Sequence, residues 1–221
     1  MRNSVMARDT TKKMDRSSVH AARQGKLPSV PPCLRGESST SVRGEYARYG
    51  VEEWYGQFGA TYRNPHESIV RELIQVSVRD WSLDLSAVLD LAAGSGEATL
   101  ALRDVGAVNV SAIDPYTGPA YLVRTGKSAE ALTFADLAAG ALAGRRYSLV
   151  VCSFALHLCE PSRLAGLMFA LAQVTPALLI LTPNKRPQLR AEWGWIMRGE
   201  RLMNRVRSRI YQRKIDPDTR P

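Results

Sequence analysis

The sequence lacks several features that would place it in particular classes of protein. It has only three cysteines among 221 residues, Cys33, Cys152 and Cys159, and this odd, sparse set does not supply a framework of structural disulfides. No apolar run is long enough to cross a bilayer, and no apolar secretory segment follows Met1. No second Cys/His pair completes a zinc site with Cys152, His157 and Cys159. We therefore expect a soluble intracellular protein with no metal and no membrane partner.

Acidic residues are outnumbered, and the excess positive charge is confined to the two ends. The net charge is +9; residues 1–44 carry +6, residues 45–184 carry −4 and residues 185–221 carry +7. Basic ends can attract nucleic acid, although most such surfaces are simply solvated. Nucleic acid therefore stays open as a partner without being favoured.

Residues 1–44 also have few large apolar side chains and no regular hydrophobic period. Such a segment cannot bury enough surface to offset its ordering entropy, so we predict a disordered basic tail. Its Arg and Ser content also resembles a transit peptide, although Asp9 and Asp15 argue against that interpretation. We expect a cytoplasmic protein, with mitochondrion or plastid as the alternative.

Residues 45–221 have the pattern of a single folded domain. Residues 46–62 hold six of the sixteen aromatics, and residues 69–78 repeat apolar side chains at helical spacing after a helix start at Asn64 and Pro65. We predict a helical lid over residues 45–81, with packing of its aromatics on a sheet edge as the alternative. A cofactor-binding core over residues 87–183 and a basic C-terminal element over residues 184–221 complete the domain.

Short apolar segments alternate with helical segments through the core. The predicted strands are 87–91, 108–113, 132–134, 147–153 and 177–182, and the predicted helices are 97–105, 119–125, 136–142 and 161–174. This alternation implies βαβ units, so we predict an α/β three-layer sandwich with a mostly parallel, doubly wound sheet and helices on both faces. Beyond it we predict a helix near 193–203 and an antiparallel C-terminal edge strand, 205–211, with a wet positive face.

A glycine turn joins the first predicted strand to the helix that begins near Glu97. Gly94 and Gly96 can adopt backbone angles closed to other residues, which lets a ligand lie against the main chain. The free N–H groups of the helix point into the same space. Thr99 stands where a dinucleotide fingerprint has its third glycine. The turn therefore predicts a nucleotide-type pocket that is not a dinucleotide site.

Carboxylates follow the predicted strands at the edge where parallel sheets bind ligands. Asp90 belongs to the first strand, Asp114 ends the second and Asp136 follows the third. A carboxylate at Asp114 can accept hydrogen bonds from both hydroxyls of a ribose, and its charge would repel a 2′-phosphate. Asp136 is placed to accept from an adenine amino group.

In these motifs the chain resembles the class I S-adenosylmethionine-dependent methyltransferases, over about residues 46–183. The resemblance rests on residues 89–96, 113–115, 135–137 and 149–157. It implies S-adenosyl-L-methionine as cofactor, with Gly94 and Gly96 at its methionyl end, Asp114 at the ribose, Asp136 at the adenine and Asp90 near the amino group. The predicted cofactor-binding residues are Asp90, Ala92, Ala93, Gly94, Ser95, Gly96, Asp114, Pro115, Tyr116, Ala135, Asp136, Leu137, Ser153 and Phe154.

The chain departs from the family pattern in two places. Ala92 stands where the family often has glycine, and only 205–211 resembles a strand where the family sheet usually ends in an antiparallel pair.

Methyl transfer depends mainly on positioning, and a nearby base helps where the acceptor loses a proton. We predict His157 as that base, with a packing or capping role as the alternative. Tyr55, Tyr62, Arg63 and His66 are the predicted lid and substrate contacts.

The predicted function is methyl transfer to a small-molecule acceptor. One alternative is an RNA- or protein-directed methyltransferase that uses the basic C-terminal surface, and another is a non-catalytic relative. Residues 152–155 lack the prolines typical of enzymes that methylate exocyclic base amines, and Cys152 and Cys159 lack the setting of a cytosine C5 nucleophile. The basic residues of the RNA alternative are Lys185, Arg186, Arg205, Arg207 and Arg209.

Overall fold

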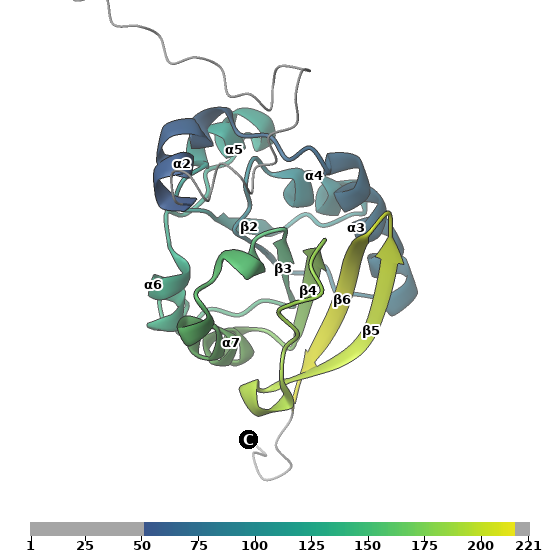
Figure 1. The fold of residues 1–221 in the computed structure, drawn as a ribbon. Helices are drawn as coiled ribbons and strands as arrows, with labels where there is room; N and C mark the ends of the chain where they lie inside the picture. The colour runs from purple at the N-terminus through teal and green to yellow at the C-terminus, as the bar shows by residue number, and fades with distance from the viewer. Residues whose placement is uncertain (1–50, 215–221) are drawn as a thin grey trace, which may run out of the picture. The chain divides into compact units, whose positions relative to one another are not determined.

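The computed structural model describes residues 51–214, which form a six-stranded sheet with helices on both faces (Figure 1). The sheet order is β2-β1-β3-β4-β6-β5; the first four strands are parallel, and β6 is antiparallel to both β4 and β5. The predicted α/β class, mostly parallel with an antiparallel C-terminal part, is confirmed. The predicted tail, residues 1–44, lies outside the described residues. The strands are β1 (Val88–Leu91), β2 (Val110–Ile113), β3 (Leu149–Ser153), β4 (Ala177–Thr182), β5 (Trp195–Met203) and β6 (Val206–Arg213).

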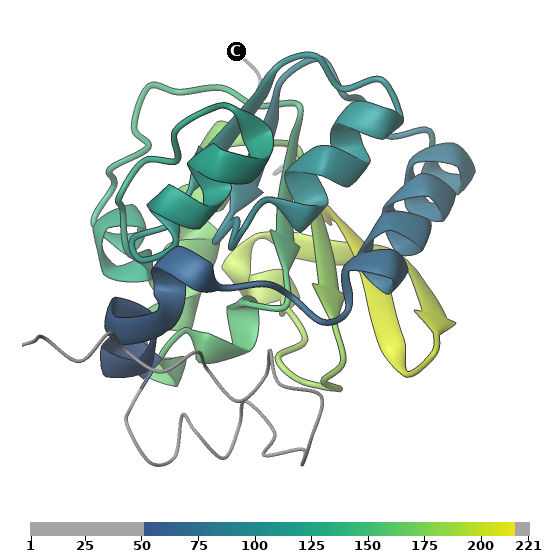
Figure 2. The same ribbon diagram turned by 90° about the horizontal axis from the view of Figure 1, so that it is seen from above.

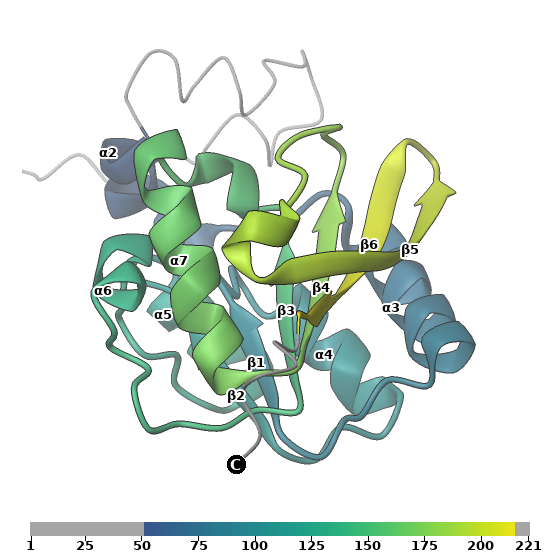
Figure 3. The same cartoon turned by 90° about the horizontal axis from the view of Figure 1, so that it is seen from below.

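Helices cover both faces because successive residues of each central strand point to opposite sides. On β1, Leu89 and Leu91 belong to the core cluster under α7, whereas Val88 belongs to the cluster under α3 and α4. Viewed from above, α3, α4 and α5 lie over the sheet (Figure 2), and α7 covers the other side when the molecule is viewed from below (Figure 3). These helices are α3 (Glu67–Trp81), α4 (Glu97–Asp104), α5 (Gly118–Thr125), α6 (Phe134–Ala138) and α7 (Pro161–Val174).

The predicted strand 132–134 is wrong. Thr133 is instead the N-cap of α6: its Oγ1 accepts from the Asp136 N–H at 3.2 Å, and the Asp136 carboxylate accepts from the Thr133 N–H at 2.8 Å. This reciprocal capping box turns the chain into a helix before it can extend along β2. The pairing that persists is an isolated bridge between Glu130 and Ile113.

The predicted helix 193–203 is also wrong, because most of it is strand β5. This strand pairs with β6 from Trp195↔Arg213 to Met203↔Val206, with a register shift between Met197 and Gly199. A two-residue turn closes the hairpin, and both its residues, Asn204 (φ 45°) and Arg205 (φ 67°), are left-handed, as in a type I′ turn. Pairing with β6 outweighs the helix propensity of the Met, Arg, Glu and Leu residues in this stretch.

Strand β6 is the strand that the sequence predicts at 205–211, but it lies between β4 and β5 and is not an edge. Its positive face is not fully wet, because Arg209 is only 1% exposed. The Arg209 guanidinium contacts the Glu200 carboxylate at 2.6 Å and donates to the carbonyls of Lys185 and Pro187. Arg209 therefore ties the β4–β5 connection to the sheet.

The predicted lid, residues 45–81, divides into two parts within the described residues. Helix α3 packs on the sheet through Val70, Leu73 and Ile74, and the Ser77 hydroxyl bonds the Ser208 hydroxyl at 2.6 Å. The part beside the cavity is α2 (Val51–Phe58) with the 3-10 turn η2 (Gly59–Thr61). We call residues 51–62 the lid segment. None of the helices within residues 51–214 is long and apolar enough to cross a membrane.

Candidate functional site

A cavity of about 690 Å³ lies at the carboxyl ends of β1, β2 and β3, between the lid segment and the loops that follow these strands. This is the edge at which open parallel sheets bind ligands. The cavity brings together many of the predicted residues. Those that line it are Tyr55, Tyr62, Ala92, Ala93, Gly94, Asp114, Pro115, Tyr116, Ala135, Ser153 and Phe154.

The other predicted residues do not line the cavity. Asp136 uses its Oδ2 in the α6 cap, while its side chain is exposed beside Ala135 of the lining, and its contact with an adenine group stays a prediction. His157 is half-buried at the centre of the 3-10 turn η3 (Leu156–Leu158). Its neighbour Leu158 lines the cavity. The residues outside the lining are Arg63, His66, Asp90, Ser95, Gly96, Asp136, Leu137 and His157.

Left-handed backbone shapes the glycine turn. Ala92 (φ 55°), Gly94 (φ 58°) and Gly96 (φ 88°) all have positive φ. A Cβ added to Gly94 would lie 3.2 Å from Tyr62 Cε1, so the missing side chain keeps the cavity floor open beneath this ring. Ala92 adopts a conformation that glycine would adopt without strain, which explains the family's frequent glycine there.

Asp114 organises the floor through three backbone amides. Its Oδ2 accepts from the Gly94 N–H at 3.0 Å, and its Oδ1 accepts from the N–H groups of Tyr116 and Thr117, both at 2.9 Å. A carboxylate offers about four acceptor positions, so one remains for a ligand. That position is on Oδ2, and the acceptance of hydrogen bonds from both ribose hydroxyls by Asp114 stays a prediction.

Asp90 lies beneath the turn and has no exposed surface. Thr99 Oγ1 donates to its Oδ2 at 2.6 Å and also lies 3.0 Å from the Tyr121 hydroxyl. Burial raises the pKa of Asp90 to about 7, and the charges of Glu97 and Asp114 add to the increase. Thr99, which stands where a dinucleotide site has its third glycine, is thus the hydrogen-bond partner of Asp90.

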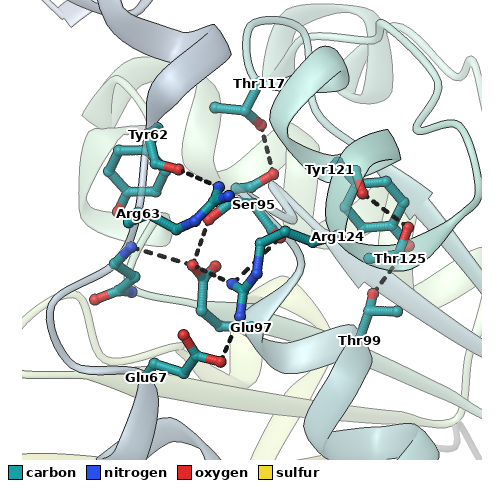
Figure 4. Close-up of polar contacts among 12 residues, drawn as sticks. Tyr62, Arg63, Glu67, Ser95, Glu97, Thr99, Thr117, Tyr121, Arg124 and Thr125 are labelled. Carbon is teal, nitrogen blue, oxygen red and sulfur yellow. Dashed lines mark hydrogen bonds and ion pairs between the residues drawn. The ribbon is translucent and has the colours of Figure 1, made fainter.

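Glu97 is a cavity residue that the sequence analysis missed. It is the first residue of α4, and its side chain is only 4% exposed. Its Oε1 accepts from the Asn64 N–H at 3.1 Å, from Arg124 Nη1 at 2.9 Å and from the Ser95 hydroxyl (Figure 4). The signal was available, because a carboxylate directly after Gly96 stands at a helix N-terminus.

Aromatic side chains hold the lid segment against the cavity. Trp54 is 1% exposed, and Tyr55 stacks on Tyr116 with ring centroids 5.8 Å apart. Just beyond the segment, His66 stacks on Phe154 at 5.1 Å. Gly59 approaches the same loop so closely that an added Cβ would lie 2.6 Å from the Tyr116 carbonyl oxygen.

The two described cysteines are not nucleophiles. Burial raises the pKa of Cys152 to about 12 and that of Cys159 to about 11, so both thiols stay protonated at neutral pH. No group of three or more His, Cys, Asp or Glu residues within 51–214 is placed to hold a metal ion.

Two of the five basic residues of the RNA alternative are engaged within the protein. Arg209 is buried, and Arg207 lies 3.8 Å from the Glu200 carboxylate with its side chain 17% exposed. Lys185, Arg186 and Arg205 are exposed.

Comparison with known proteins identifies one clear relative. An uncharacterized protein of Schizosaccharomyces pombe is 35% identical, in a match that covers 70% of this chain and 79% of that protein. No protein-family model matches the chain.

Solved structures share the fold at low identity. A putative RNA methyltransferase from Pyrococcus horikoshii has a TM-score of 0.54 and 14% identity over 73% of this chain and 90% of its own. An O-methyltransferase family protein from Burkholderia thailandensis has a TM-score of 0.52 and 19% identity over 78% of this chain and 62% of its own. The magnesium protoporphyrin IX methyltransferase of Synechocystis with bound SAH has a TM-score of 0.50 and 19% identity over 78% of this chain and 98% of its own.

Proposed function

We propose a function from two premises: the chain belongs to the same family as the Schizosaccharomyces pombe protein, and it has the Rossmann-like fold of the class I S-adenosylmethionine-dependent methyltransferases. The protein is an enzyme that binds S-adenosyl-L-methionine and transfers its methyl group to a small-molecule acceptor. The observation that carries this proposal is the cavity above Gly94, bordered by Asp114 and covered by the aromatic lid segment.

The residues of this cavity fit the cofactor. Gly94 leaves room for a ligand against the main chain, and Asp114 keeps one acceptor position for a hydroxyl. Tyr116 and Phe134 offer aromatic surface for a base. When bound, the cofactor would supply a methyl group on a positively charged sulfur, which a nucleophile can attack in line.

The chain's own contribution is to position the acceptor and exclude water. Tyr55 and Tyr62 line the cavity from the lid segment, and Phe154 lines it from the loop after β3. His66 stacks on Phe154 of the cavity lining, and His157 adjoins Leu158 of the same lining, so both are candidates to take a proton from the bound methyl acceptor.

A small acceptor is favoured over RNA. Arg207 and Arg209 are engaged with Glu200, which reduces the basic surface available to a phosphate backbone. A non-catalytic relative would bind the cofactor or a protein partner without turnover.

The test has two stages. Calorimetry should first detect binding of S-adenosylhomocysteine to the wild-type chain and its loss in Asp114→Ala. Labelled S-adenosylmethionine should then transfer its methyl group to a component of a metabolite extract, and not to RNA. Absence of binding by the wild-type chain would overturn the proposal, binding without transfer would favour the non-catalytic relative, and labelling of RNA would favour the alternative acceptor.

A further inference from the structure

A three-residue charge cluster borders the cavity beside the glycine turn. Arg124, from the last turn of α5, bonds Glu97 at 2.9 Å and Glu67 at 2.5 Å, and its side chain is 16% exposed. Glu67 begins α3 and Glu97 begins α4, so the cluster joins three helices (Figure 4). Two carboxylates against one guanidinium leave the cluster with one uncompensated negative charge.

The two oxygens of Glu97 differ in their partners. Oε1 accepts from Asn64, Ser95 and Arg124, whereas no hydrogen bond from the described residues reaches Oε2. Oε2 lies 3.5 Å from the position that a Cβ on Gly94 would take, so it points into the space above the glycine. A charged oxygen with almost no exposed surface is stabilised by a cationic donor.

From this geometry we propose that Glu97 Oε2 accepts hydrogen bonds from the cationic α-amino group of the ligand's amino-acid portion. Glu97 is then the residue that selects ligands carrying an amine at this end of the cavity. The inference rests on the proposed function, because the amine belongs to the methionyl part of the cofactor. The positive charge of the ligand's ammonium group faces the cluster's uncompensated negative charge.

Asp90, which the sequence assigned to this amino group, is not available for it. It has no exposed surface and does not line the cavity, whereas Gly94 and Glu97 do. Burial also raises its pKa to about 7, so near neutral pH much of it is uncharged. Glu97 is the carboxylate of α4 that reaches the cavity.

The experiment compares two ligands that differ only in the amine. Calorimetry measures the Kd of S-adenosylhomocysteine and of its deaminated analogue, in which hydrogen replaces the α-amino group. The proteins are the full wild-type chain, Glu97→Gln, Glu97→Asp and Glu72→Gln, a matched control on the exposed face of α3. Gln keeps an oxygen for Asn64 and Ser95 but removes the charge.

The wild-type chain and Glu72→Gln should prefer the amine by about tenfold or more, the size of a charge-assisted hydrogen bond. Glu97→Gln should lose most of that preference while binding the deaminated analogue about as well as the wild type. Glu97→Asp should keep part of the preference, because it keeps the charge.

Two results would overturn the inference: an unchanged preference in Glu97→Gln, or equal weakening of both ligands, which indicates a structural role. If the wild-type chain bound neither ligand, the proposed function would fail first, so the two failures are distinguishable.

Discussion

Asp90 is a carboxylic acid without exposed surface, and its burial couples folding to pH. Burial raises its pKa from 3.8 to about 7. Between these values the native chain holds a proton that the unfolded chain has released, so the free energy of unfolding falls as the pH rises from about 4 to about 7. The fall attributable to this group is at most about 4 kcal/mol, at 1.36 kcal/mol for each pKa unit.

Asp90→Asn removes the titration and keeps an oxygen for the Thr99 hydroxyl. We compare the free energies of unfolding of the two chains in urea at pH 5 and pH 8. On going from pH 5 to pH 8 the stability of the variant relative to the wild type should increase by a few kcal/mol, as the pKa difference requires. The comparison between the two chains cancels the titration of all other groups. A difference between the chains that is the same at both pH values would contradict the prediction.

Asp114 supports the cavity floor, so we expect Asp114→Asn to damage both binding and stability. Asn keeps one acceptor oxygen, so its NH2 group faces either the Gly94 N–H or the N–H groups of Tyr116 and Thr117, and each N–H orphaned in this way costs about 1–3 kcal/mol. Affinity for S-adenosylhomocysteine should fall about tenfold or more by calorimetry. Asp104→Asn is the control, since its carboxylate is 42% exposed. Wild-type affinity in Asp114→Asn would disprove the role.

The sequence predicts a site residue best when its side chain has no competing role in local structure. Asp114 directly follows β2 and Gly94 lies in the turn after β1, and both line the cavity. Asp136 does not line the cavity, and its Oδ2 caps α6 through Thr133, a local role that the sequence analysis did not assign to it. Glu97 was missed because its position at the cavity depends on contacts with Arg124 and Asn64, which only the fold brings together.

At the level of elements, the turn η2 lies against the loop after β2 at Gly59. An alanine Cβ there would lie 2.6 Å from the Tyr116 carbonyl oxygen, and backbone cannot yield as a flexible side chain can. Gly59→Ala should therefore displace the lid segment and weaken binding of S-adenosylhomocysteine by about tenfold, or 1.4 kcal/mol. Gly118→Ala is the matched control, because nothing lies within 4 Å of its added Cβ. Equal affinities in the two variants would refute the lid contact.

The β5–β6 hairpin offers a stability prediction. Arg205 has a φ of 67°, which glycine adopts without steric cost, and type I′ turns favour Asn-Gly. Arg205→Gly should raise the free energy of unfolding by about 0.5–1 kcal/mol, and Asn204→Ala should lower it by a similar amount. Urea denaturation measures both, and a loss of stability in Arg205→Gly would rule out the turn type.

Elements were predicted best where local pattern and tertiary packing agree. Both α7 and β4 have the bounds that the sequence predicts, because Pro161 starts the helix and a continuous apolar run forms a strand buried on both faces. Strand β5 was not predicted: most of its central residues are exposed, so its conformation depends on pairing with β6.

At the scale of the whole molecule, the site draws residues from many elements between α2 and α7. The lid segment, the loops after β1 to β3 and the first turns of α3 and α4 all meet at one cavity or its border. A ligand held by several elements binds only the folded chain and therefore stabilises it as a unit.

Thermal unfolding with ligand tests this cooperative arrangement. At a hundred times its Kd, S-adenosylhomocysteine should add about 2.7 kcal/mol to the free energy of unfolding. For a chain of this size, this raises Tm by about 5–10 °C. NAD at the same concentration should leave Tm unchanged, because Thr99 stands where a dinucleotide site needs glycine and instead holds Asp90 beneath the turn. A rise in Tm with NAD and none with S-adenosylhomocysteine would assign the cavity to a dinucleotide. A rise with S-adenosylhomocysteine alone shows that this ligand binds the folded chain and stabilises it.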